Sequence, residues 1–329
     1  MYMDSIVFFD AEIEPKSRKI LDIGAVTGAG NTFHSNNISG FTSFIKGTTY
    51  ICGHNVLRHD FNYTKYALTD AGINPANIID TLYLSPLLFP SRPYHALLKD
   101  DKLQTDELNN PLNDAIKAKE LFLAEIDAFN KLDLNLKSIF YLLLSKFSGF
   151  GAFFSYISFK PVSDEILPLI RNVYNGEICG NADINKLLTE HPLELAYCLS
   201  LINARNRYSI TPPWVLKNFP DVEHIMYLLR NRPCLTGCVY CNQALDIHKA
   251  LNRYFGFSSY RAYAGERLQE NAVKAAVDNQ SLLAVFPTGG GKSITFQVPA
   301  LMAGETAKGL TVVISPLQSL MKDQVDNLE

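Results

Sequence analysis

The apolar positions of residues 5–130 follow two spacings, one typical of strands and one typical of helices. Short apolar runs rich in β-forming residues predict strands at 5–9, 19–26, 31–34 and 78–80. The spacing lengthens to that of a helix after Cys52 and again at 113–129, where the pattern is clearly amphipathic. Strands that come first and then alternate with helices predict an α/β domain with a mixed sheet flanked by helices.

The rest of the chain divides by the same pattern into three further parts. Residues 135–232 carry apolar patches at helical spacing, broken by glycine and proline, which predict a mostly helical connecting domain. From residue 281 strand-like and helix-like runs alternate again, with strands expected at 281–287 and 309–316. We therefore expect four units: a first domain at 1–134, the connecting domain at 135–232, a cysteine-rich segment at 233–248, and a last α/β unit at 249–329.

Composition and charge exclude some classes of protein and leave the class of partner open. Hydrophobic residues make up 47% of the chain and charged residues 19%, which is typical of a folded globular protein. The net charge is −3, from 33 acidic and 30 basic residues, and a basic groove can coexist with an acidic site. The start lacks the features of a signal peptide, and the most apolar stretch, 139–144, is far shorter than a membrane span. These features predict a cytoplasmic protein.

Four acidic residues stand where strands are expected to end and helices to begin. Asp10 and Glu12 are two positions apart at the end of an apolar strand, so their side chains emerge from the same face. Taken alone, such a pair is also typical of a solvated strand end. Asp60 and Asp114 add two more carboxylates, and such hard oxygen ligands suit magnesium or manganese. Together the four indicate a two-metal phosphodiester hydrolase.

The segments that carry these acids resemble the motifs of the DEDD exonuclease family. FFDAEIEP is similar to the first motif, GHNVLRHD to the second, NNPLNDA to the third, and IDTLYLSPLL to the segment between the last two. The resemblance implies a ribonuclease-H-like mixed sheet and removal of nucleotides from the 3′ end of DNA. It also implies that Asp10, Glu12 and Asp114 hold the metal that activates water, and that Asp10 and Asp60 serve a second metal.

The expected general base of this family is missing from the third motif. In the histidine subclass the base stands five positions before the last aspartate, where this chain has Asn109, and the tyrosine of the other subclass would replace Asn110. Loss of a general base costs ~10²–10⁴-fold in rate. His95 is the nearest histidine in sequence and the one substitute to consider, whereas we expect His54 and His59 to serve packing or polar support.

Three of the six cysteines fall close together in the segment PCLTGCVYCN. The spacing of Cys234, Cys238 and Cys241, with His248 seven positions later, predicts a structural zinc site. An iron–sulfur cluster, of radical-SAM or helicase type, and three reduced thiols packed in a turn are the alternatives. The scattered cysteines are expected to be buried apolar fillers, namely Cys52, Cys179 and Cys198.

The segment FPTGGGKS at 286–293 predicts a phosphate-binding loop for ATP. Gly289 and Gly291 let backbone N–H groups turn toward phosphates, Lys292 would reach the β- and γ-phosphates, and Ser293 would ligate magnesium. With the following GLTVVISPLQSLMKDQVDNL it resembles motifs I and Ia of RecQ-type superfamily-two helicases, which implies a RecA-like lobe. Upstream, YFGFSSYRAYAGERLQ resembles the adenine-reading motif of that family through Arg261 and Gln269, although five extra residues separate the two.

Two functions are compatible with these motifs. The first is a metal-dependent 3′→5′ exonuclease acting on single-stranded or frayed DNA, in a protein that also unwinds DNA with ATP, for example in DNA repair. The alternative is a catalytically weak module that grips DNA 3′ ends for the helicase. The chain stops at Glu329, before the helicase motifs that follow motif Ia, so we expect this chain by itself to lack ATP turnover.

Overall fold

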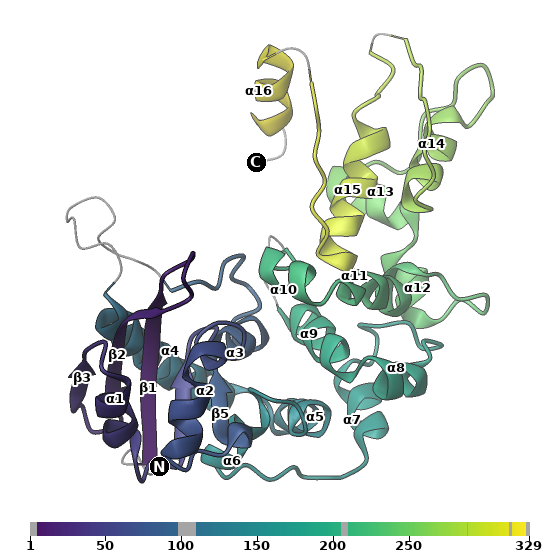
Figure 1. Ribbon diagram of the computed structural model, residues 1–329. Helices are drawn as coiled ribbons and strands as arrows, with labels where there is room; N and C mark the ends of the chain where they lie inside the picture. The colour runs from purple at the N-terminus through teal and green to yellow at the C-terminus, as the bar shows by residue number, and fades with distance from the viewer. Residues whose placement is uncertain (1–4, 98–109, 205–209, 288, 316–317, 327–329) are drawn as a thin grey trace.

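The computed structural model describes residues 5–97, 110–204, 210–287, 289–315 and 318–326. Its sheet has five strands in the order β3-β2-β1-β4-β5 (Figure 1). β1 pairs antiparallel with β2 and parallel with β4, while β2–β3 is antiparallel and β4–β5 parallel. The predicted mixed sheet is confirmed, and its strands are β1 (Ile6–Ile13), β2 (Ile20–Thr27), β3 (Thr32–His34), β4 (Tyr50–Gly53) and β5 (Ile78–Asp80).

The central strand β1 sends alternate side chains into two separate cores. Phe9 packs against Phe41 of α1 (Ile38–Ile45), in the core that α2 (Phe61–Asp70) also covers. Phe8 points to the opposite face and packs against Phe122 of α4 (Pro111–Lys131), with ring centroids 5.5 Å apart. Because β1 runs on to Ile13, the same alternation turns Asp10 toward the α4 side.

The start of α4 lies directly against the sheet because of a glycine on β2. Gly24 is the register partner of Asp10, and a Cβ placed on Gly24 would lie 1.9 Å from the backbone nitrogen of Leu112. The side chain of Asn110 caps the helix by accepting from Leu112 N–H at 3.0 Å and from Asn113 N–H at 3.3 Å. Pro111 follows at the first helical position, where its missing N–H costs nothing. These features place the first turn of α4 beside β1.

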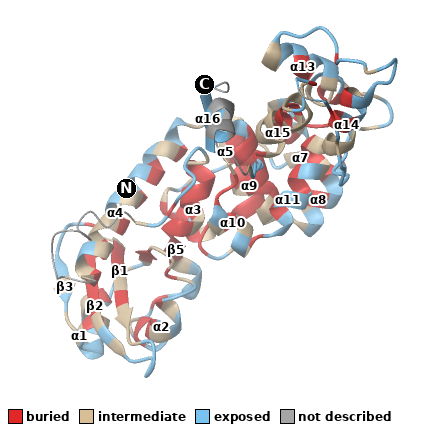
Figure 2. Cartoon of the chain, turned by 90° about the horizontal axis from the view of Figure 1, so that it is seen from above, coloured by how far each residue is buried: buried red, intermediate tan, exposed pale blue. Residues whose placement is uncertain are grey.

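The segment 132–231 is mostly helical where the structure describes it, and it shares a core with the α4 face of the sheet. Figure 2 shows buried positions in α3, α5 and α9, and they belong to one hydrophobic cluster with Phe8. Hydrogen bonds cross the same boundary: Tyr197 donates to the carbonyl of Tyr83, and Ser200 to that of Leu87. The helices of this core are α3 (Thr81–Leu88), α5 (Leu134–Leu144), α6 (Gly151–Tyr156), α7 (Ile166–Val173), α8 (Ile184–Glu190), α9 (Pro192–Asn203), α10 (Pro213–Asn218), α11 (Asp221–Met226) and α12 (Val239–Ala244).

The last part of the chain contains helices but lacks the strands that its sequence predicts. Helices α13 (Ile247–Phe255), α14 (Leu268–Val277) and α15 (Ile294–Ala307) form a small core, and an extended segment leads to α16 (Gln318–Asp326) (Figure 1). The expected strands at 281–287 and 309–316 are wrong for the described residues, whose backbone is irregular there. Leu283, Val285 and Ile314 are 91%, 80% and 90% exposed. A β-strand needs at least one neighbouring strand to pair with, and the described residues supply none for these segments.

No described helix combines the length and the apolar character needed to cross a membrane.

Candidate functional site

Three of the four acids meet at the junction of β1 and α4. The alternation of β1 puts Asp10 and Glu12 on one face, and Asp114 stands in the first turn of α4, where a negative charge is favoured by the helix dipole. Carboxylate oxygens of the three residues lie within 4.8 Å of one another. Asp10 and Glu12 lie inside the strand and not after it, because β1 extends four residues beyond the predicted end.

The fourth acid, Asp60, is buried just before α2 and is hydrogen-bonded to β1, the strand that carries Asp10 and Glu12. Its Oδ1 accepts from the N–H of Ala11 at 3.1 Å and lies 3.2 Å from Nδ1 of His59. Burial raises the pKa of Asp60, although the hydrogen bonds from His59 and Ala11 oppose that shift. The contact with Ala11 ties Asp60 to the backbone between Asp10 and Glu12.

Burial and the neighbouring carboxylates change the chemistry of Asp10 most. Burial is the largest cause, and together with the negative charges of Asp60, Asp114 and Glu12 it raises the pKa of Asp10 to about 8. A nearby cation would stabilise the anionic form of a carboxylate surrounded in this way. Carboxylate oxygens within 4.8 Å of one another can bind one ion between them, and such hard ligands suit magnesium or manganese, so the residues present fit a divalent metal.

Asp80 holds the loop that leads to Asp60. Its two carboxylate oxygens accept three backbone hydrogen bonds: from Asn55 at 2.9 Å, from Leu57 at 3.0 Å and from Leu82 at 3.0 Å. Burial nevertheless raises its pKa to about 7. The sequence showed Asp80 only as part of a family-like segment, and the structure shows that it fixes the turn between β4 and α2.

The histidines divide between the core and the acidic site. His95 is buried with Nδ1 2.8 Å from Ser85 Oγ, and burial lowers its pKa to about 4. His54 is likewise mostly buried, with Nδ1 2.9 Å from Thr81 Oγ1. His59 is half exposed and interacts with Asp60, a hydrogen bond that raises its pKa. Asn109, the position of the expected base, lies outside the described residues, and the side chain of Asn110 is used as the helix cap.

The cysteine-rich segment forms a four-sulfur group whose fourth member differs from the predicted one. Cys234, Cys238 and Cys241 come together, and the fourth sulfur is that of Cys179. Cys179 is buried in the hydrophobic core, as predicted, but its sulfur also joins this group, which the sequence did not indicate. The predicted ligand His248 lies on α13, with Nε2 3.1 Å from Glu270 Oε1, and it is not part of the group.

Two residues of the adenine-motif segment, Arg261 and Gln269, donate hydrogen bonds to backbone carbonyls of the phosphate-loop segment. Gln269 is buried, accepts from Arg261 N–H at 2.8 Å and donates to the carbonyl of Gly291 at 2.9 Å. The Arg261 guanidinium donates to the carbonyl of Gly289 at 3.1 Å. Gly289 and Gly291 have φ of 74° and 68°, a region that favours glycine. The loop leads to Lys292 and Ser293 at the start of α15, while residue 288 lies outside the described part.

These motif contacts agree with what comparison with known proteins finds. Residues 266–329 match the DEAD/DEAH box helicase family. The chain is 46% identical over 87 residues to the ATP-dependent DNA helicase RecQ of Bacillus subtilis, and 43% identical over 97 residues to that of Haemophilus influenzae. It is also 41% identical over 83 residues to the ATP-dependent DNA helicase Q5 of Rattus norvegicus. The aligned residues amount to 25%, 30% and 25% of this chain.

The similarity is therefore local. The chain spans 13%, 14% and 8% of the length of these three relatives. The family match begins at residue 266, beyond the four acids and the cysteine group. No solved structure matches the chain. The last part of the chain is thus similar to RecQ-type ATP-dependent DNA helicases. The acidic site of the sheet domain lies outside this similarity and is supported by its geometry.

Proposed function

We propose that the sheet domain is a metal-dependent nuclease that removes nucleotides from the 3′ end of single-stranded or frayed DNA. The observation that carries this proposal is the convergence of Asp10, Glu12 and Asp114 within 4.8 Å, with Asp60 tied to the same strand. The strand order β3-β2-β1-β4-β5 supports it, because this is the order of the ribonuclease-H-like sheet that the exonuclease resemblance implies.

Each acid has a distinct part in this proposal. Asp10, Glu12 and Asp114 would hold one divalent ion, and Asp10 and Asp60 a second. When bound, magnesium or manganese supplies an activated water and neutralises charge on the leaving oxygen. The chain contributes a rigid frame, since β1 fixes Asp10 and Glu12, the capped start of α4 fixes Asp114, and Ala11 fixes Asp60.

The helicase-related part supports a second activity for the protein to which this site belongs. We propose that Lys292 and Ser293 bind the phosphates and magnesium of ATP, in a loop shaped by Gln269 and Arg261. Unwinding driven by ATP would supply the single strand that a buried metal site can admit. DNA and ATP are the partners of this proposal, and DNA repair is a setting that fits it.

A 3′-end-binding module without strong catalysis is the second candidate. It is favoured by the amides at positions 109 and 110, because an amide cannot accept the proton from water, and by the use of Asn110 as a helix cap. In that case the four acids would bind metal and DNA, and cutting would be slow.

Digestion of a 5′-labelled single-stranded oligonucleotide separates the two candidates. With magnesium or manganese, the nuclease proposal predicts a ladder that shortens one nucleotide at a time from the 3′ end, and no reaction in chelator. Asp10→Asn and Asp114→Asn should each lower the rate by more than ~100-fold, because groups that merely orient metal ligands already cost about 10–100-fold.

The matched control for this assay is Asp127→Asn. Asp127 lies on α4 as Asp114 does, but it is exposed and pairs with Lys131 at 2.6 Å, so its substitution should leave the rate unchanged. Tight binding of 3′ ends in magnesium without cutting would favour the binding module. Digestion that continues in chelator or in Asp114→Asn would rule out the metal mechanism.

A further inference from the structure

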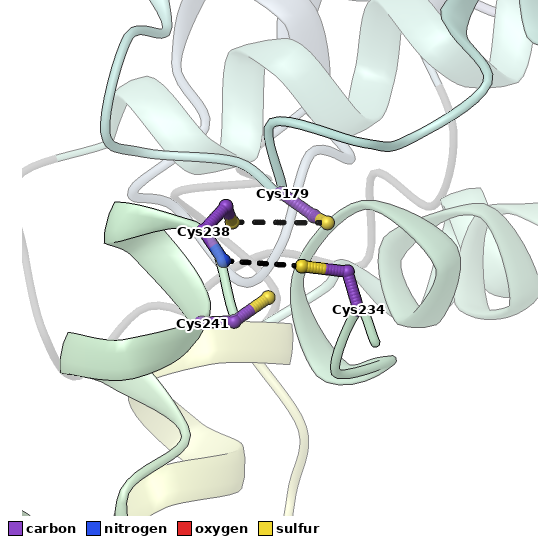
Figure 3. Close-up of side chains that lie close together, drawn as sticks. All are labelled: Cys179, Cys234, Cys238 and Cys241. Atoms are coloured by element: carbon purple, nitrogen blue, oxygen red, sulfur yellow. Dashed lines mark hydrogen bonds between the residues drawn. The ribbon is translucent and has the colours of Figure 1, made fainter. Parts of the chain in front are cut away.

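Four cysteine sulfur atoms from two distant parts of the chain meet beside α12. Cys179 lies in the turn between α7 and α8, and the other three lie between residues 234 and 241. Figure 3 shows the four side chains pointing toward a common centre. Their Sγ atoms all lie within 4.8 Å of one another, and those of Cys238 and Cys179 are 4.0 Å apart. All four thiols are free, so no disulfide accounts for this approach.

The sulfur spacing suits a single metal ion. Four thiolates around zinc, each about 2.3 Å from the ion, lie about 3.8 Å from one another at the corners of a tetrahedron. In a [4Fe–4S] cluster each thiolate binds a different iron, so the four sulfurs stand farther apart than around one ion. The separations in this group therefore favour a mononuclear site over a cluster.

Backbone N–H groups donate hydrogen bonds to two of the four sulfurs. Gly180 N–H donates to Cys238 Sγ at 3.3 Å, and Cys238 N–H donates to Cys234 Sγ at 3.2 Å. Since the thiolate is the form that binds metal, these two N–H donors are placed to stabilise two of the four ligands.

Contacts outside the sulfurs hold the two segments together. Cys179 N–H donates to the carbonyl of Leu229 at 2.8 Å, and the Asn181 amide donates to Thr236 Oγ1 at 2.7 Å. Gly237 has a φ of 65°, which lets the chain turn back between Cys234 and Cys238. The two segments that carry the cysteines are thus joined by hydrogen bonds as well as by the approach of their sulfurs.

We propose that Cys179, Cys234, Cys238 and Cys241 bind one zinc ion, with Cys179 as the fourth ligand. This ion joins the α7–α8 turn to the segment that leads into the helicase-related part. Cys179 and Cys238 are 59 positions apart, so the metal closes a long loop that includes α8 to α11. The role of this zinc ion is structural, because protein ligands fill all four positions of its tetrahedral coordination.

The test compares the metal content of the full chain with that of two variants, all purified without chelator. The wild type should contain about one zinc per chain by elemental analysis. Cys179→Ser should lose it, whereas His248→Ala, which removes the histidine that the sequence suggests as a ligand, should keep it. A cavity of about 590 Å³ is lined by Cys179 and Cys234, so a chelator should also reach the ion and release it from the wild type.

A second measurement keeps the proposal testable if Cys179→Ser does not fold. Wild-type protein loaded with cobalt(II) should show the intense sulfur-to-metal absorption and visible bands of a tetrahedral site with four thiolates. Four outcomes would overturn the proposal: no metal in the wild type, iron with inorganic sulfide, zinc retained by Cys179→Ser, or a cobalt spectrum of three thiolates and one imidazole. None of these readouts depends on nuclease activity.

Discussion

Replacement of Asp10 by asparagine should make the metal-free protein more stable at neutral pH. The same replacement should remove the stabilisation of the fold by a divalent metal. Burial of Asp10, together with the negative charges of Asp60, Asp114 and Glu12, raises its pKa from 3.8 to about 8. Between those two values the folded protein keeps a proton that the unfolded chain releases. Stability from this group is therefore fully present below about pH 4 and is lost as the pH rises through about 8.

The expected change in folding stability follows from the pH range between the two pKa values of Asp10. While the two states differ by one proton, stability falls by about 1.4 kcal/mol for each pH unit, which is about 3 kcal/mol from pH 5 to pH 7. Asp10→Asn removes this contribution, and the other buried acids keep theirs. A divalent metal present at 100 times its Kd should stabilise the wild type by about 2.7 kcal/mol. The variant should gain far less, because it lacks the carboxylate shared by both ions.

Urea denaturation at pH 5, 6, 7 and 8 measures both effects, in chelator and in magnesium. Asp127→Asn is the control, since it removes an exposed carboxylate from the same helix as Asp114. We expect that the free energy of unfolding of Asp10→Asn falls less steeply with pH than that of the wild type. We also expect that magnesium no longer stabilises this variant, whereas Asp127→Asn behaves as the wild type. If the variant keeps the wild-type slope and the wild-type response, the carboxylates do not act together on a cation.

Three further predictions concern the packing of α4 against the sheet, a buried acid of α4 and the missing general base. Gly24→Ala should displace the start of α4, since its Cβ would meet the backbone of Leu112, and should lower metal affinity measured by calorimetry; unchanged affinity would refute the close packing. Glu125 is fully buried, neither oxygen has a hydrogen-bond partner, and burial raises its pKa, so wild-type stability should fall as the pH rises above about 4.5. Glu125→Gln should flatten that fall in urea titrations, and an identical pH profile would contradict the assignment. Asn109→His should raise the digestion rate ~10-fold or more at pH 7 to 8, where a neutral imidazole can accept a proton, and a slower variant would show that the chain uses another base.

The acid-bearing part of the fold could be predicted because local rules decide it. Alternation along β1 places Asp10 and Glu12 on one face whatever the rest of the chain does, and the amphipathic pattern at 113–129 predicts the helix that forms α4 (Pro111–Lys131). The length of β1 was underestimated, since its polar residues are carried in the strand by pairing with β2.

The fourth sulfur and the last strands could not be predicted, for a different reason. Cys179 stands alone in the sequence, and only the packing of α7 to α12 brings it to Cys238. The expected strands at 281–287 and 309–316 have the right residues, but a strand forms only with neighbours, and the described residues offer none there. Both cases depend on contacts between distant parts of a chain, which a local pattern does not contain.

The central claim is that the carboxylates of β1 and α4 form a divalent metal site. Crystals of the wild-type chain soaked in manganese test it most directly, because anomalous scattering places the ion without reference to activity. We predict a manganese peak within bonding distance of Asp10, Glu12 and Asp114, which is absent from Asp10→Asn crystals soaked in the same way. Saturating manganese with these carboxylates ordered and no peak among them would contradict the account.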